Sequence, residues 1–231
     1  MLDARLLAKA LGILNMFGNK INPEKIKKKN TKLLKKLGIN VVEHLPWVEV
    51  REHRSATEVA ERCVILSALL QLRFGAPKDY IENYLKENDL IKGLSPEECK
   101  LLKIDYDDLE EQDHANLNWS IEAIWALAWI GKKHDSLSFN TGVEDTLAKM
   151  LPNFEQGERA NAFVDSFNLR SEKEVFTELD KFYRAHWFAR NNKLNGQSSP
   201  LVDLDIIMER RRALEWVSNN TESWDEISLD T

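Results

Sequence analysis

The chain has 231 residues and a net charge of −6, and its content of 43% hydrophobic and 30% charged residues excludes a disordered chain. No uncharged apolar run approaches the roughly 20 residues of a membrane span, and Asp3, Arg5 and Lys9 argue against a signal peptide. The two cysteines, Cys63 and Cys99, belong to no paired-cysteine motif and are expected to be reduced. We therefore expect a soluble protein of the cytoplasm.

The first predicted helix is basic. Asn22-Pro23 opens it, Gly38 ends it, and residues 25–36 contain seven lysines. Residues 1–54 carry 12 Lys and Arg against 5 Asp and Glu, a net +7, whereas residues 55–231 carry 20 against 33, a net −13. Such a helix can contact nucleic acid or a membrane, but this one has no Arg and no aromatic side chain to stack on a base. We favour a helix that is solvated or docked against acidic residues.

Capping boxes, in which Glu follows Ser by three residues, predict three further helix starts. They occur at Ser55, Ser95 and Ser171. Between the first two, Pro77 can start a short helix, so this part of the chain is predicted to be a series of short helices. The box at Ser171 begins the longest predicted helix, which runs to about Leu194.

A helix predicted over residues 116–131 is apolar nearly all round and is therefore expected at the centre of the fold. A last helix is predicted over 203–218, and only residues 39–50 look extended, which cannot make a sheet alone. We predict an all-α, single compact multi-helix domain with little or no sheet. It comprises a basic helical arm, 1–54, packed on or flanking a body, 55–231, that should fold without the arm. Tryptophans on inward helix faces are expected in the core: Trp119, Trp125, Trp129, Trp187 and Trp216.

Sequence motifs for metal or cofactor binding are absent. Residues 105–113 have the charge of a calcium loop, but Glu110 replaces its turn glycine and Asn116 its last carboxylate. No nucleophile elbow, phosphate-binding loop or dinucleotide fingerprint occurs, so we expect no cofactor and leave enzymatic activity open. No metal site is expected either, because no metal-ligand spacing relates the five histidines, His44, His53, His114, His134 and His186.

Several charged side chains occupy positions that the pattern places in the core. Glu122 lies on the central helix, and Arg210 lies between apolar residues of the last helix. Buried charges must be paired, so we favour a salt-bridge cluster that sets helix register. The alternative is a catalytic or ligand-binding cleft. The candidate residues for either are Glu122, Asp180, Tyr183, Arg184, His186, Glu209 and Arg210.

Several different short motifs are spaced along residues 54–231. They are Arg54-Ser55, Glu58-Val59-Ala60-Glu61-Arg62, Trp119-x-x-Glu122-Ala123, Ala128-Trp129-Ile130-Gly131, Leu169-Arg170-Ser171, Asp180-x-x-Tyr183-Arg184-x-His186-Trp187, Glu209-Arg210-x-x-Ala213-Leu214-x-Trp216, Trp224-Asp225 and Asp230-Thr231. Together they resemble the family known as domain of unknown function 4272 (DUF4272). The resemblance implies a mostly helical, soluble protein, and it implies no particular reaction, cofactor or partner.

Because no catalytic motif is present and the body is acidic, we expect a protein-interaction domain, such as an accessory or immunity-like binding partner. Its partner is expected to be a protein, and neither nucleic acid nor a membrane is expected. The alternative is a hydrolase-type enzyme that uses Glu122, Asp180, His186 and Arg210, which a deep, water-filled cavity around them would favour. Nucleic-acid contact through the lysine helix is a third, weaker alternative.

Overall fold

The computed structural model describes residues 21–231, in which eight α-helices and four short 3₁₀ helices are joined by irregular segments, with no strand. Residues 1–20, and with them the expectation based on Asp3, Arg5 and Lys9, lie outside this range. Within residues 21–231, no helix combines the length and apolarity that crossing a bilayer requires. The elements are α2 (Pro23–Lys36), α3 (Ala56–Arg73), α4 (Lys78–Glu87), η1 (Ile91–Gly93), α5 (Pro96–Leu101), η2 (Tyr106–Asp108), α6 (Glu111–Ile130), η3 (Leu147–Lys149), α7 (Ala160–Asp165), α8 (Glu172–Leu194), α9 (Leu204–Val217) and η4 (Trp224–Glu226).

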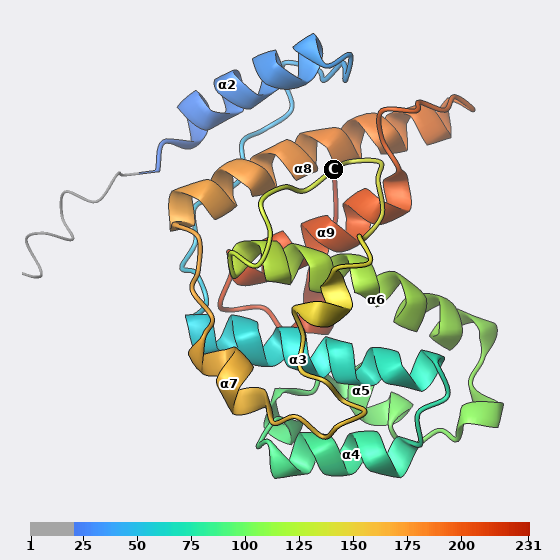
Figure 1. Cartoon of the computed structure of the whole chain (residues 1–231). Coiled ribbons are helices and arrows are strands. Elements are labelled where there is room, and N and C mark those ends of the chain that lie inside the picture. Colours follow the sequence, from blue (N-terminus) through green and yellow to red (C-terminus); the bar gives the residue numbers. More distant parts are fainter. Residues whose placement is uncertain (1–20) are drawn as a thin grey trace, which may run out of the picture.

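The helices form a stack in which each one packs on the next, in the order α4, α3, α6, α9, α8 and α2 (Figure 1). The middle helix, α6, makes its most extensive contacts with α3 and α9, and α7 packs beside α3. This arrangement confirms the predicted all-α single domain around a central apolar helix. It also places α2 and α4 at opposite ends of the molecule (Figure 1).

Helix starts follow the local capping signals. The Ser boxes predicted at residues 55, 95 and 171 are all present, with each Ser side chain accepting the backbone N–H three residues later. The central helix was predicted to start too late: α6 begins at Glu111 because Glu110 and Asp113 form a capping box there. Carboxylates in the first turn also favour this earlier start, since they interact with the helix dipole.

The core around α6 is tightly packed. Ala123, Leu127 and Ile130 are completely buried, and a Cβ atom at Gly131 would collide with the ring of Phe167, so the end of α6 requires glycine for its packing. Trp125, Trp129 and Trp216 lie in the core as expected. Trp119 and Trp187 are only half-buried, contrary to the prediction. Trp119 lines a surface cleft, and Trp187 packs against the small cluster beneath α2.

The basic helix α2 packs along α8 through its apolar face. Leu34, Ile39 and Leu45 are buried in a small cluster against α8, which contributes Tyr183, Trp187 and Phe188. The lysines of α2 form only two ion pairs within residues 21–231, both with neighbours close in sequence, so the helix is solvated rather than docked against acidic residues of the body. Whether the body folds without this arm stays a prediction.

Candidate functional site

The seven candidate residues do not form one cluster. Four of them make two separate buried ion pairs, two lie beside Arg211, and one lines a surface cleft. The two ion pairs are Glu122 with Arg210 and Asp180 with Arg184. Tyr183 and His186 each contact Arg211, and Glu209 lines the cleft.

The Glu122–Arg210 pair joins α6 to α9. Arg210 Nε donates to Glu122 Oε2 at 2.9 Å, and Arg210 Nη2 lies 2.7 Å from the same oxygen. Arg210 also donates to the carbonyls of Ser138 (2.6 Å) and Thr141 (2.9 Å), which lie in the loop after α6. Burial raises the pKa of Glu122, while Arg210 lowers it. The pair is a buried connection between two helices and a loop.

The Asp180–Arg184 pair lies under α2. Arg184, which is completely buried, donates from Nε to Asp180 Oδ2 at 3.0 Å and from Nη2 to Asp180 Oδ1 at 2.7 Å. Asn30 of α2 donates to Asp180 Oδ2 at 2.9 Å, and Arg184 Nη2 donates to the carbonyl of Pro46 at 3.0 Å. These bonds attach the arm to α8, as expected for a structural network.

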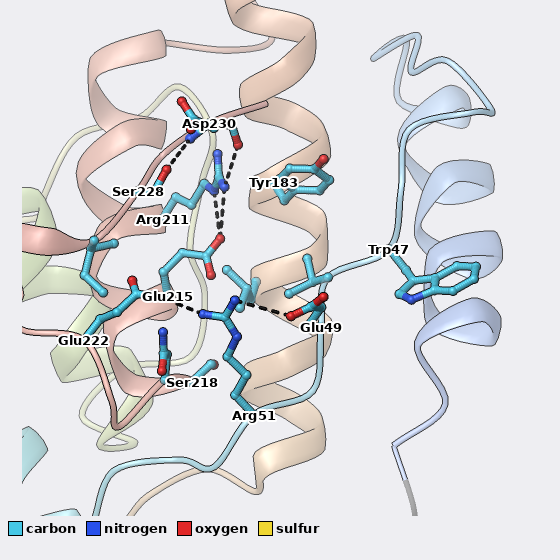
Figure 2. A pocket seen from close by; sticks show the side chains of 14 residues that line it. Trp47, Glu49, Arg51, Tyr183, Arg211, Glu215, Ser218, Glu222, Ser228 and Asp230 are labelled. Atoms are coloured by element: carbon cyan, nitrogen blue, oxygen red, sulfur yellow. Dashed lines mark hydrogen bonds and ion pairs between the residues drawn. The ribbon is translucent and has the colours of Figure 1, made fainter.

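Arg211 connects α9 to α8 and to the C-terminal tail. Its Nη1 donates to His186 Nδ1 at 2.8 Å and to the Leu229 carbonyl at 3.0 Å. Its Nη2 donates to Glu215 Oε1 at 3.0 Å (Figure 2). Arginine has no acceptor, so His186 accepts through Nδ1 and is neutral. Burial, followed by the charge of Arg211, lowers the pKa of His186 to about 4.

A polar cavity of about 230 Å³ lies beside this arginine, between α8, the end of α9, residues 47–51 and the tail. Glu215 and Tyr183 line it, and burial raises the pKa of both groups. Ser218 is buried, and its hydroxyl has no hydrogen-bond partner among residues 21–231. At the edge, Arg51 is paired with Glu49 and Glu222 (Figure 2). The cavity is small, and all its charged side chains except Asp230 form ion pairs with one another within residues 21–231.

A larger cleft of about 520 Å³ lies where α3, α5, α6, α9 and η4 meet, and we call it the acidic cleft. Apolar side chains form much of its wall, including the two half-buried tryptophans Trp119 and Trp224. Five carboxylates but only two cations line it. The lining residues are Leu66, Leu69, Glu97, Glu98, Lys100, Leu101, Ile104, Asp113, Asn116, Leu117, Trp119, Ser120, Glu209, Arg212, Trp224 and Asp225.

Two carboxylates of the acidic cleft, Asp113 and Asp225, form no ion pair within residues 21–231 and accept only backbone N–H groups. The candidate residue Glu209 faces Arg212 at 3.3 Å, and burial raises the pKa of Glu209. The charge of Arg212 opposes this rise in pKa, and the negative charges of Asp205 and Glu122 add to it. The acidic cleft therefore combines excess negative charge with exposed aromatic surface.

The sequence reasoning missed Arg211, Glu215 and the clustering of Trp119 and Trp224. An i,i+4 spacing of opposite charges on a predicted helix could have indicated the Arg211–Glu215 pair. No local pattern could have indicated the acidic cleft, because its walls come from five elements far apart in the chain.

In residues 21–231 there is no group of three His, Cys, Asp or Glu residues placed to hold a metal ion. The family model described as domain of unknown function (DUF4272) matches residues 26–227, so the likeness starts inside α2, earlier than residue 54. Neither a curated protein nor a solved structure matches the chain significantly.

Proposed function

The chain belongs to the DUF4272 family, and from that premise we propose that it is a protein-interaction domain that binds a partner at the acidic cleft. The partner segment presents a Lys or Arg side chain together with apolar side chains. The observation that carries the proposal is a cleft of about 520 Å³ in which unpaired carboxylates lie beside half-buried tryptophans.

The chemistry of the acidic cleft supports a basic and apolar segment. Asp113 and Asp225 retain oxygen lone pairs for a cationic donor. The indole ring of Trp119 can pack on the donor's aliphatic stem or stack on its guanidinium, whereas the guanidinium of Arg62 already lies over the ring of Trp224. Aromatic residues at the centre of a pocket with a charged edge are typical of protein interfaces. The net charge of −13 over residues 55–231 would also attract a basic partner.

The alternative proposal, a hydrolase-type enzyme, has less support from the geometry. Glu122, Asp180 and Arg210 line neither of the two cavities described above. Arg210 binds Glu122 and two backbone carbonyls, and Asp180 accepts from Arg184 and Asn30. The neutral His186 lies apart from both ion pairs, with its Nδ1 bound to Arg211. A general base and a nucleophile within hydrogen-bond reach of each other are therefore not assembled from this set.

A peptide-binding assay tests the proposal. Fluorescently labelled peptides of Lys, Arg and Leu should bind the full chain, and matched peptides with Gln or Glu in place of the cations should not. Changing Asp113 and Asp225 together to Asn should weaken binding by roughly tenfold, since a partly exposed ion pair contributes up to about 1 kcal/mol. Trp119→Ala should weaken it further, through the loss of aromatic contact.

The matched control is the double change Glu49→Gln and Glu222→Gln, which removes two carboxylates from the polar cavity instead. It should leave peptide binding unchanged. Equal binding of basic and acidic peptides, or equal losses in the cleft variant and the control, would refute the proposal.

A further inference from the structure

The solvent face of α2 carries a row of lysines. Lys25, Lys29, Lys32 and Lys36 are all exposed and recur at intervals of three or four residues, which places them on one side of the helix. The opposite side is fixed to α8, because Asn30 is buried and bonded to Asp180. We call this row the lysine face, and it extends over about 16 Å at 1.5 Å per residue.

Within residues 21–231, no acidic side chain forms an ion pair with the lysine face. The ion pairs that α2 forms within residues 21–231 are Lys28 with Glu24 and Lys35 with Glu43, and neither involves the four lysines of the face. The row therefore presents four uncompensated positive charges in one direction. Its charge is thus available to an external anionic surface.

Exposed leucines border the lysine face. Leu33 and Leu37 are 39% and 52% exposed, although they lie on a helix whose other leucine, Leu34, is completely buried. Leu201, 39% exposed, lies next to Gly38 at the end of the helix. Apolar side chains that remain in water beside a row of cations are typical of helices that lie on an anionic lipid surface.

Contrary to the expectation from the sequence that no membrane is a partner, we propose that α2 binds the surface of an anionic lipid bilayer. The lysine face lies over the headgroups, and Leu33 and Leu37 insert between them. Nucleic acid fits less well, because α2 has no Arg to pair with phosphate in bidentate geometry and no aromatic side chain to stack on a base. In this orientation the opposite end of the helix stack, with α4 and α5, faces away from the lipid (Figure 1).

Co-sedimentation of the full chain with lipid vesicles tests the proposal. The protein should bind vesicles of phosphatidylcholine with added phosphatidylserine, should not bind phosphatidylcholine alone, and should be released by salt. The triple change Lys29→Gln, Lys32→Gln and Lys36→Gln should weaken binding on the order of 100-fold, since each lysine near an anionic surface contributes a factor of about five. The double change Leu33→Ser and Leu37→Ser should weaken it by roughly tenfold.

The control for charge is the triple change Lys92→Gln, Lys103→Gln and Lys149→Gln, which removes three exposed lysines outside α2. The control should bind vesicles as the parent does, and thermal melts should show that all variants fold. The proposal is overturned if the control loses as much binding as the α2 variant, or if the leucine changes have no effect. It is also overturned if the parent binds a DNA or RNA duplex more tightly than the vesicles.

Discussion

Replacing Glu122 with Gln should destabilise the protein strongly, although the substitution changes little in shape. Arg210 is completely buried and bonds to Glu122 and to the carbonyls of Ser138 and Thr141. In Glu122→Gln the amide oxygen can still accept a hydrogen bond, but the guanidinium loses its counter-charge. Removing one member of a buried pair costs about 3–5 kcal/mol, and the two remaining carbonyls favour the lower value. A cost of about 3 kcal/mol corresponds to a Tm lowered by roughly 6–12 °C in a chain of this size.

Urea and thermal melts of Glu122→Gln, Arg210→Met and the double variant measure this cost. They also measure the interaction free energy between Glu122 and Arg210. The double variant should lose less than the two single losses added, because neither charge is then left alone. The control is Glu97→Gln, which removes an exposed pair with Lys100 and should change stability by less than about 0.5 kcal/mol. A Glu122→Gln protein as stable as the parent, or a double variant whose loss equals the sum, would refute the ion-pair reasoning.

Three further changes test other parts of the fold. Burial and the charge of Arg211 lower the pKa of His186 from 6.5 to about 4. Between these pH values the unfolded state binds a proton that the folded state does not, so the parent should lose stability as the pH falls. In urea melts over this range, His186→Gln should flatten that loss, and the exposed His44→Gln should not. Asn30→Ala removes two hydrogen bonds between α2 and α8, which should cost about 1–3 kcal/mol and speed amide exchange in α2. Gly131→Ala forces a methyl group into the Phe167 ring and should cost about 1–3 kcal/mol in thermal melts, partly recovered by adding Phe167→Leu.

The acidic cleft and the lysine face lie on different elements, and this separation makes their two proposals independent. The first concerns α3, α5, α6, α9 and η4, and the second concerns α2 alone. Variants of one surface should therefore leave the function of the other unchanged, so peptide binding and vesicle binding serve as folding controls for each other.

Local sequence rules predicted most of the helices. A capping box needs only four consecutive residues, such as those that begin at Ser55. Gly38, which follows α2, adopts a left-handed φ of +85°. Short-range signals of this kind determine where helices begin and end. The pairing of Asp180 with Arg184 was also predictable, because i,i+4 residues on one helix lie side by side. At α6 the start was misplaced because the prediction followed the apolar run and overlooked the acidic capping box of Glu110 and Asp113 that precedes it.

The sequence by itself determined the all-α class, the central position of the apolar helix and the need for each buried charge to find a partner. For pairs that join different helices, only the tertiary structure decided which partners those were. Glu122 meets Arg210 across 88 residues, Asn30 meets Asp180 across 150, and His186 accepts from Arg211 across 25. These pairings depend on how whole helices pack, and packing is governed by the fit of many side chains at once rather than by spacing along the chain. The acidic cleft arises for the same reason, because it is the space that five packed elements leave unfilled.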